Sequence, residues 1–443
     1  MKKGAKIAVT ILLAISIATF AFLAGFFVER CSSDKALASY KWALKTIKEN
    51  YYFDEPDISY TQTSLKAIAD TYLDKYSEYY TKEEYAAVQK SNSGSKSGVG
   101  VSYSFVKDRG IFVNKVVGNS PAYKSGLRAG EWIKSGKGES GEEVIFNSSA
   151  SFSSFISSAP DGVEVTFTSA EGKTYSIAKS EYTASYCSYY TSSEKLLYNP
   201  SSGNYELKLD YNAYSFLPEG CAYLRLDQFY GSAVNEFYTM IEHFNSSKCT
   251  SLILDLRSNG GGYVSVMQDI AGCFADGDSQ LAMLSRDKKG VEEKYDCKKI
   301  TKANRRVDKS VNVFVLANAG TASASEALIG AMVCYGALTY ENIFLSQYTD
   351  DDGYLSWLKT SGQEVKNGRT YGKGIMQTPF TNYRTGEVLK LTTAKIFWPD
   401  KKTSIHDIGI TLADGCTAVK TDWEWTKGDR ELQSAVEEIK KRI

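Results

Sequence analysis

Two neighbouring pieces of the chain decide its kind of fold: the strand-like run Val311-Asn312-Val313-Phe314-Val315-Leu316 and the small-residue run Gly320-Thr321-Ala322-Ser323-Ala324-Ser325-Glu326. A second apolar run, Leu252-Ile253-Leu254-Asp255-Leu256-Arg257, is likewise followed by small residues and then by an apolar helical stretch. From about residue 220 to the end, buried-looking strands therefore alternate with helices. This alternation predicts a layered α/β core.

The small-residue run also offers serine hydroxyls, and about fifty residues later comes Tyr371-Gly372-Lys373-Gly374. A serine hydroxyl needs a nearby base to become a nucleophile. Only two histidines, His243 and His406, occur in 443 residues, so a lysine is the more plausible base. A lysine acts this way only when its amine is neutral, which requires desolvation or a neighbouring positive field. The glycines beside Lys373 leave room for a tight, dry pocket, so the sequence indicates serine/lysine chemistry of a protease.

The N-terminus has the pattern of a membrane signal. Lys2, Lys3 and Lys6 precede Ile7–Val28, a run of 22 residues without a charge. As a helix this run spans about 33 Å at roughly 1.5 Å per residue, enough to cross a hydrocarbon core of about 30 Å. Its length and the missing small-residue cleavage site favour a signal anchor over a cleaved signal peptide, and the approach to Cys31 does not fit a lipoprotein signal.

The lysines before the apolar run favour a cytoplasmic N-terminus with the rest of the chain translocated. We therefore expect a protein of the bacterial cell envelope, anchored in the inner membrane with its body in the periplasm. If the N-terminus is cleaved, the protein is secreted.

Composition excludes several classes of protein. Lys+Arg and Asp+Glu number 52 each, so the clustered positive charge of a nucleic-acid-binding protein is not expected. Eight cysteines are scattered without a C-x-x-C pair, and no H-E-x-x-H occurs, so we predict neither a metal site nor a cofactor and leave disulfide pairing open. We predict a signal region at 1–32, a helical region at 33–96, a β-rich domain at 97–185, a catalytic core at 186–430 and a C-terminal helix at 431–443.

The β-rich domain carries three recognisable pieces, Gly98-Val99-Gly100-Val101, Ser120-Pro121-Ala122 and Gly126-Leu127-Arg128-Ala129-Gly130-Glu131. Together they resemble a PDZ domain of the kind found in bacterial processing proteases, with Glu131 where an aspartate is usual. The resemblance implies binding of protein carboxyl termini by strand addition. The backbone N–H groups that would take the terminal carboxylate are those of Val99, Gly100 and Val101.

Four motifs of the core follow one another in a known order: the opening strand at 220–229, the glycine turn Asp255-Leu256-Arg257-Ser258-Asn259-Gly260-Gly261-Gly262, and the serine and lysine runs quoted above. Behind a PDZ-like domain, they resemble the carboxyl-terminal processing proteases, also called tail-specific proteases. The resemblance covers nearly everything after the membrane segment and implies a core of the Clp-protease and crotonase type. It implies Ser323 as nucleophile, Lys373 as general base, Gln377 as the residue that orients Lys373, and the N–H groups of Gly261 and Ala324 as the oxyanion hole.

Some features depart from this family. The spacing between serine and lysine is long, which indicates an insertion around 341–369, and Gly260 stands where a proline is common. Ser325 is the second candidate nucleophile, and we interpret His406 as structural. The chain lacks both the G-x-S-x-G elbow and the K-T-G motif of penicillin-binding proteins.

Two other functions stay open: a catalytically silent exported PDZ scaffold, and an acyltransferase or esterase that uses the same dyad. The expected partners are protein or peptide substrates with exposed C-termini, and the membrane. The sequence leaves the oligomeric state open.

Overall fold

The computed structural model describes residues 38–53, 65–199, 204–209, 214–277, 279–349, 366–421 and 429–442. The chain divides into two compact units: unit 1 is formed by residues 1–86 and 377–394, and unit 2 by residues 87–376 and 395–443. Among the described residues, no helix has both the length and the apolar character needed to cross a bilayer. The predicted membrane helix at Ile7–Val28 lies outside the described residues.

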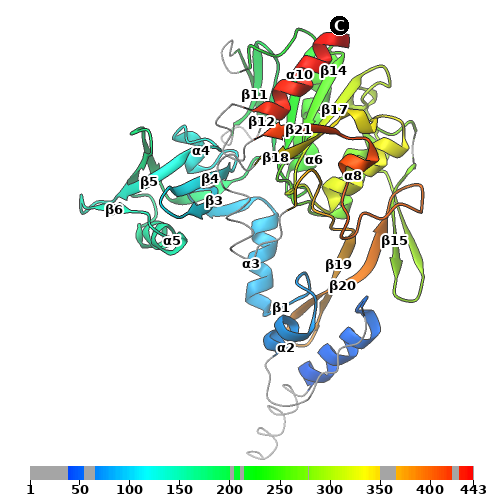
Figure 1. Ribbon diagram of the computed structural model, residues 1–443. Helices are drawn as coiled ribbons and strands as arrows, with labels where there is room; N and C mark the ends of the chain where they lie inside the picture. The colour runs from blue at the N-terminus through cyan, green and yellow to red at the C-terminus, as the bar shows by residue number, and fades with distance from the viewer. Residues whose placement is uncertain are drawn as a thin grey trace, which may run out of the picture. The chain divides into compact units, whose positions relative to one another are not determined.

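An eight-stranded sheet forms the centre of unit 2, in the order β12-β11-β10-β13-β14-β17-β18-β21 (Figure 1). The strands from β13 to β21 pair in parallel, and β10 to β12 extend the sheet with antiparallel pairs. The two apolar runs that predicted an α/β core are the adjacent strands β14 and β17, so that prediction is confirmed. The strand bounds are β10 Cys187–Tyr190, β11 Glu194–Asn199, β12 Asn204–Leu209, β13 Cys221–Leu226, β14 Ser251–Asp255, β17 Asn312–Ala317, β18 Ile343–Tyr348 and β21 Thr417–Thr421.

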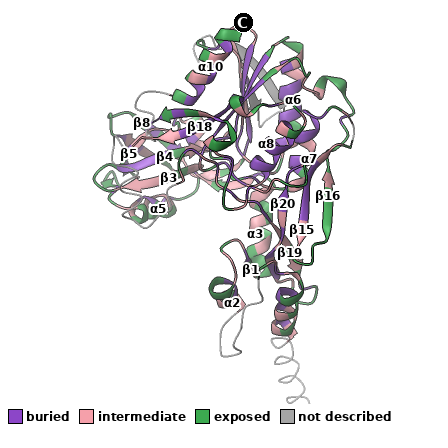
Figure 2. Cartoon of the chain, turned by 45° about the vertical axis from the view of Figure 1, so that its right-hand side comes forward, coloured by how far each residue is buried: buried purple, intermediate pink, exposed green. Residues whose placement is uncertain are grey.

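Helices cover both faces of this sheet (Figures 1 and 2). Leu252 and Leu254 of β14 belong to the hydrophobic cluster of α6, α7 and α8, whereas Ile253 belongs to the cluster of α10. Successive side chains of a strand point to opposite faces, so a strand that is apolar throughout can be buried on both. The helix bounds are α6 Ala233–Ser246, α7 Val264–Gly272, α8 Ala324–Cys334 and α10 Arg430–Arg442, and β15 Leu281–Asp287 pairs antiparallel with β16 Glu292–Asp296.

The β-rich domain, also in unit 2, contains a six-stranded sheet in the order β3-β4-β5-β7-β8, with β6 paired to β5. β3 lies at one edge of this sheet. The run Gly98-Val99-Gly100-Val101 does not form one continuous strand, because Gly100 turns the chain with a φ of 83° between β2 and β3. The bounds are β2 Ser95–Gly98, β3 Val101–Val106, β4 Gly110–Val116, α4 Pro121–Lys124, β5 Trp132–Lys137, β6 Glu143–Ile145, α5 Ser149–Ser158, β7 Glu164–Ser169, β8 Thr174–Ala178 and β9 Ser180–Thr183.

Unit 1 combines two distant parts of the sequence. A helix over residues 38–50 packs with α2, and their apolar residues Ile47 and Ile68 form one cluster with Leu389 and Leu391 of β20. β1 pairs antiparallel with β20, which places Tyr79 opposite Leu389. Residues 377–394 thus group with the N-terminal residues, whereas the predicted boundaries placed them within 186–430. The bounds are α2 Leu65–Tyr72, β1 Glu78–Tyr80, α3 Lys82–Asn92, β19 Ile375–Thr381 and β20 Val388–Phe397, of which α3, β19 and β20 continue into unit 2.

Candidate active site

The candidate active site lies at the carboxyl ends of two neighbouring strands. β14 leads into the glycine turn 258–262, and β17 leads into the run 318–326. Because β14 and β17 pair in parallel, both loops leave the sheet at the same edge, where α/β folds place their ligand sites. Asn318 joins the loops, since its Oδ1 accepts hydrogen bonds from the backbone nitrogens of Ser258 at 2.8 Å and Gly320 at 3.0 Å.

Asn259 holds the glycine turn in place. It is fully buried, and its Nδ2 donates to the carbonyl of Leu226 at 2.8 Å. Its Oδ1 accepts from the N–H of Gly261 at 2.9 Å. Its own carbonyl accepts from the N–H of Ala322 at 2.9 Å and from the hydroxyl of Ser325 at 3.0 Å. Asn259 therefore fixes the turn to the loop that carries both candidate serines.

The two serines occupy different environments. Ser325 is fully buried and its hydroxyl already donates to Asn259. Ser323 is half-buried and occupies the N-cap position of α8. This environment favours Ser323 over Ser325 as a nucleophile that a substrate can reach.

The backbone at Ser323 is strained. Its φ of 57° and ψ of −115° lie in a region that residues other than glycine seldom adopt. Such strain costs free energy and is concentrated at functional sites, where the surrounding structure enforces it. Gly261 lies against it, because a Cβ at Gly261 would be 2.9 Å from the Cβ of Ser323 and 2.8 Å from the nitrogen of Ala324.

Glu326 joins the serine loop to the lysine segment. Its Oε2 accepts hydrogen bonds from the backbone nitrogens of Ser323 at 2.8 Å and Lys373 at 3.0 Å. Its Oε1 accepts from the hydroxyl of Thr370 at 2.5 Å and from the N–H of Gly372 at 2.8 Å. The side chain is fully buried, and this burial raises the pKa of Glu326, an effect that the four hydrogen bonds oppose.

The glycines beside Lys373 allow close backbone contacts. Gly372 has a φ of 85°, and its carbonyl accepts from the N–H of Asp407 at 2.8 Å. A Cβ at Gly374 would come within 2.6 Å of the backbone nitrogen of His406. The segment that contains His406 therefore packs directly on the lysine segment, and Lys373 itself is half-buried.

The predicted oxyanion-hole donors differ in their surroundings. The N–H of Ala324 is the first of α8, and no described residue accepts a hydrogen bond from it. The N–H of Gly261, in contrast, is engaged by Oδ1 of Asn259. The structure thus brings together the backbones of Ser323, Ala324, Gly261 and Lys373. Of these four residues, only Ala324 has an N–H without an acceptor among the described residues.

Gln377 belongs to unit 1, where its Nε2 donates to Oγ1 of Thr392 at 3.1 Å. Its role toward Lys373 stays a prediction.

The residues predicted to bind a carboxylate lie where the edge strand β3 begins. The carbonyls of Val99 and Gly100 accept from the N–H groups of Ala122 and Val117, both at 2.9 Å. The N–H groups of Val99 and Gly100 have no acceptor within the described residues. A Cβ at Gly100 would lie 2.1 Å from Cβ of Ser120, so only glycine fits this turn. Val101 begins β3 and pairs with Val116.

A buried cluster of ion pairs surrounds Arg257, the residue that directly precedes the glycine turn 258–262. Arg257 donates to Asp255 at 2.7 Å, to Asp429 at 2.6 Å and to Glu431 at 3.3 Å. Arg225 contacts Asp255 from the neighbouring strand at 3.2 Å. Burial alone would raise the pKa of Asp255, but the two guanidinium groups hold it well below its usual range.

Sequence reasoning missed Asn259 and Glu326 as residues that organise the site. Glu326 carried a usable signal, because Ser323 and Glu326 form the S-x-x-E pattern of a capping box. Asn259 carried only a local signal, the Asn turn to Gly261. Its other contacts, to Leu226, Ala322 and Ser325, join segments that are far apart in the sequence.

The core is similar in sequence to a known family of peptidases. The profile of peptidase family S41 matches residues 220–339, which include β13, β14, β17 and the Ser323 loop. Over these residues the chain resembles peptidase family S41. Its curated relatives include a probable CtpA-like serine protease of Staphylococcus haemolyticus, 23% identical over 372 residues, which cover 84% of this chain and 62% of that protein.

A probable CtpA-like serine protease of Staphylococcus saprophyticus is 24% identical over 412 residues, with 91% of this chain and 70% of that protein covered. The structure of a putative S41 protease from Bacteroides fragilis matches with a TM-score of 0.57 at 16% identity, over 91% of this chain and 97% of that one. That match shows a shared S41-type fold. This chain spans 62% of the length of the Staphylococcus haemolyticus relative.

Proposed function

We propose that this protein is a serine endopeptidase in which Ser323 is the nucleophile and Lys373 the general base. One observation carries the proposal: a single oxygen of Glu326 accepts hydrogen bonds from the backbone of both residues. The two backbone nitrogens therefore lie no farther apart than the sum of those two hydrogen-bond lengths. Segments fifty residues apart in the sequence are held together at a strained serine.

In the proposed reaction, the neutral amine of Lys373 takes the hydroxyl proton of Ser323 as its oxygen attacks the scissile carbonyl. The tetrahedral intermediate collapses to an acyl-enzyme, and the ammonium of Lys373 returns the proton to the leaving amine. A water molecule, deprotonated by the same amine, then releases the acyl group and restores Ser323. The reaction uses no metal and no cofactor.

The N–H of Ala324 is the proposed primary donor to the oxyanion, because it stands at the N-terminus of α8 beside Ser323. The N–H of Gly261 is the proposed second donor. It has to exchange Asn259 for the substrate oxygen, since Asn259 accepts it in this structure. An oxyanion, which carries a full negative charge, is a stronger acceptor than a neutral amide.

Capture of substrate is proposed to occur at β3, with the β-rich domain acting as a PDZ domain. Two features support this part: β3 is an edge strand, which can pair with an added peptide, and the N–H groups of Val99 and Gly100 have no acceptor among the described residues. The carboxylate of a peptide's C-terminus would accept hydrogen bonds from both N–H groups.

In the active site, Gln377 is proposed to orient Lys373.

The location is proposed from the sequence. Ile7–Val28 would anchor the chain in the inner membrane and place the remainder in the periplasm. The alternative of a catalytically silent scaffold is disfavoured, because the backbone of Ser323 is strained and Glu326 links it to the backbone of Lys373 by hydrogen bonds.

The test is cleavage of an unstructured protein by the full-length chain, followed by mass spectrometry of the products. The proposal expects cleavage by wild type and by Ser325→Ala, and none by Ser323→Ala or Lys373→Ala. Cleavage of esters without cleavage of peptides would favour the esterase alternative. Binding of carboxyl-terminal peptides without any cleavage would favour the scaffold.

A further inference from the structure

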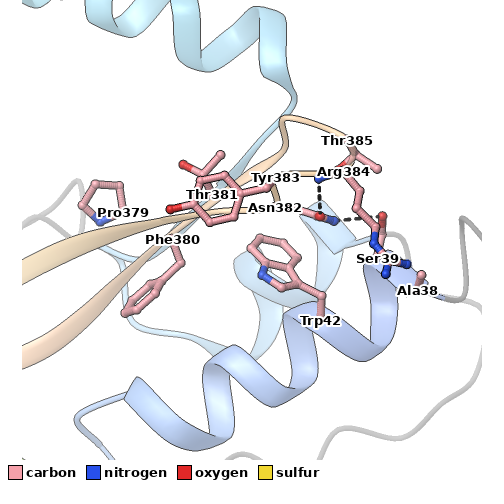
Figure 3. A pocket seen from close by; sticks show the side chains of 10 residues that line it. All are labelled: Ala38, Ser39, Trp42, Pro379, Phe380, Thr381, Asn382, Tyr383, Arg384 and Thr385. Atoms are coloured by element: carbon pink, nitrogen blue, oxygen red, sulfur yellow. Dashed lines mark hydrogen bonds between the residues drawn. The ribbon is translucent and has the colours of Figure 1, made fainter.

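Unit 1 contains a groove that the proposed catalysis does not use. It has a volume of about 850 Å³ and lies between the helix 38–50 and the tip of the β19–β20 hairpin (Figure 3). Trp42 projects from the helix toward the hairpin, which contributes Phe380 and Tyr383. Tyr383 is 97% exposed, the highest exposure among the large hydrophobic side chains of the described residues.

The hairpin tip is fixed to the helix 38–50 through Ser39. The carboxylate of Glu387 accepts from the hydroxyls of Ser39 at 2.7 Å, Tyr79 at 2.8 Å and Thr385 at 2.6 Å, and from Nδ2 of Asn382 at 3.2 Å. These bonds hold the loop rigidly, so the exposure of Tyr383 is a property of an ordered turn. The Tyr383 side chain is therefore held in its exposed position by the fold of the turn.

The position of the groove in the chain indicates what it faces. Ala38, which lines the groove, is the tenth residue after Val28, where the uncharged run Ile7–Val28 ends. Ten residues reach at most about 35 Å when fully extended. A membrane that held this run would therefore lie within that distance of Ala38, and so close to the hairpin tip bound to it.

The chemistry of the tip matches a lipid surface. Tyrosine and tryptophan are enriched at membrane–water interfaces, where an apolar ring and a polar atom are both satisfied. Arg384, next to Tyr383, is exposed, and Lys41 is exposed one turn along the helix from Ala38. Basic residues of this kind are attracted to anionic headgroups, by about 1 kcal/mol each.

We infer that the tip residues Tyr383 and Arg384, with the groove lined by Trp42 and Phe380, form a surface that rests on anionic lipid and holds unit 1 at the membrane. This inference rests on the proposed anchor at Ile7–Val28. The surface adds a second attachment, which fixes the orientation of unit 1 more firmly than the anchor alone.

Photocrosslinking of the full-length chain in vesicles of phosphatidylglycerol and phosphatidylethanolamine tests this. The photoreactive residue p-benzoylphenylalanine replaces Tyr383 in one variant. In the matched control it replaces Phe53, an exposed aromatic residue beyond the far end of the same helix, about 20 Å along its axis. A third variant carries the probe at Phe20, inside the proposed anchor.

We expect lipid adducts at position 383 about tenfold above those at position 53. Arg384→Glu should reduce the adducts at 383 by at least about fivefold, the factor that corresponds to 1 kcal/mol at an anionic surface. Adducts at 20 with none at 383 above the control would overturn the inference while the anchor stands. Adducts at neither position would overturn both, whereas adducts at 383 alone would support the surface and reject the anchor. A crosslink from 383 to a second copy of the chain would show a protein contact instead and overturn the lipid assignment.

Discussion

The backbone nitrogens of Ser323 and Lys373 donate hydrogen bonds to the same atom, Oε2 of Glu326, at 2.8 and 3.0 Å. A buried carboxylate that receives four hydrogen bonds sets the distance between the two segments more firmly than packing alone. Positioning of the proposed nucleophile and base thus depends on the hydrogen bonds that a third residue accepts from their backbones.

Glu326→Gln tests this positioning role. The amide keeps one acceptor oxygen but turns the other into a donor, so two buried donors lose their acceptor. Each loss costs about 1–3 kcal/mol of stability. We expect kcat to fall roughly 100-fold with KM little changed, because Ser323 and Lys373 move relative to each other. The measurements are peptide cleavage kinetics and urea unfolding. Unchanged kcat in a destabilised variant would reduce Glu326 to a structural residue.

The same carboxyl predicts a dependence of stability on pH. Burial raises the pKa of Glu326 above its ordinary value of 4.5, so the native state holds this proton more tightly than the unfolded state. The stabilisation from protonation is complete below pH 4.5 and is lost as the pH rises through the raised pKa. Urea unfolding of wild type and Glu326→Gln between pH 4 and 8 should show wild type losing stability relative to the variant as pH rises. A difference that is independent of pH would contradict the raised pKa.

Ser323→Ala should fold and be inactive. Alanine has the same backbone restrictions as serine at a φ of 57°, so the strain is unchanged. Loss of the nucleophile should lower kcat by about 10⁴-fold or more. Ser325→Ala is the matched control, since it removes a buried hydroxyl two residues away and should keep most of the activity while losing about 1 kcal/mol of stability. Activity lost in Ser325→Ala and kept in Ser323→Ala would exchange the two assignments.

Lys373→Arg should be inactive although its charge is kept, because a guanidinium does not give up its proton at accessible pH. In wild type, activity should rise with pH as the amine of Lys373 loses its proton. The measurement is kcat/KM from pH 6 to 10 for both proteins. An arginine variant with measurable activity and the same pH profile would exclude lysine as the base.

Gly100→Ala should remove the preference for a free carboxyl terminus. Its Cβ would collide with Ser120, and a φ of 83° is strained for alanine, so the turn that presents the N–H groups must change. Gly138→Ala in the same domain is the control, because a Cβ there meets no atom within 4 Å. We expect wild type and Gly138→Ala to cleave a peptide with a free C-terminus better than its amidated form. If Gly100→Ala keeps that discrimination, the carboxylate lies elsewhere.

The fold of the core could be predicted from sequence because β14 and β17 are apolar on both faces and each leads into small residues. The division into units could not. Leu389 and Leu391 look like any alternating strand, and nothing local shows that β20 pairs with β1 from the N-terminal region. Gly98 to Val101 looks like one strand by composition, yet Gly100 breaks it by its close contact with Ser120.

The active site, too, could be predicted from the sequence only in part. The motif around Ser323 predicted the residues that carry chemistry, since their types and spacing are local. The engagement of the Gly261 N–H by Asn259 depends on how the turn closes. The motif predicts that the N–H of Gly261 is a donor, but it does not predict that Asn259 accepts this hydrogen bond in the absence of substrate.

Covalent labelling by a fluorophosphonate, with the modified residue located by mass spectrometry, tests directly whether Ser323 is the nucleophile and Lys373 its base. Wild type, Ser325→Ala, Ser323→Ala and Lys373→Ala are compared at one pH. We expect one label, on Ser323, in wild type and in Ser325→Ala, and none in the other two variants. Label on Ser325, or labelling of Ser323 that proceeds equally fast without Lys373, would contradict it.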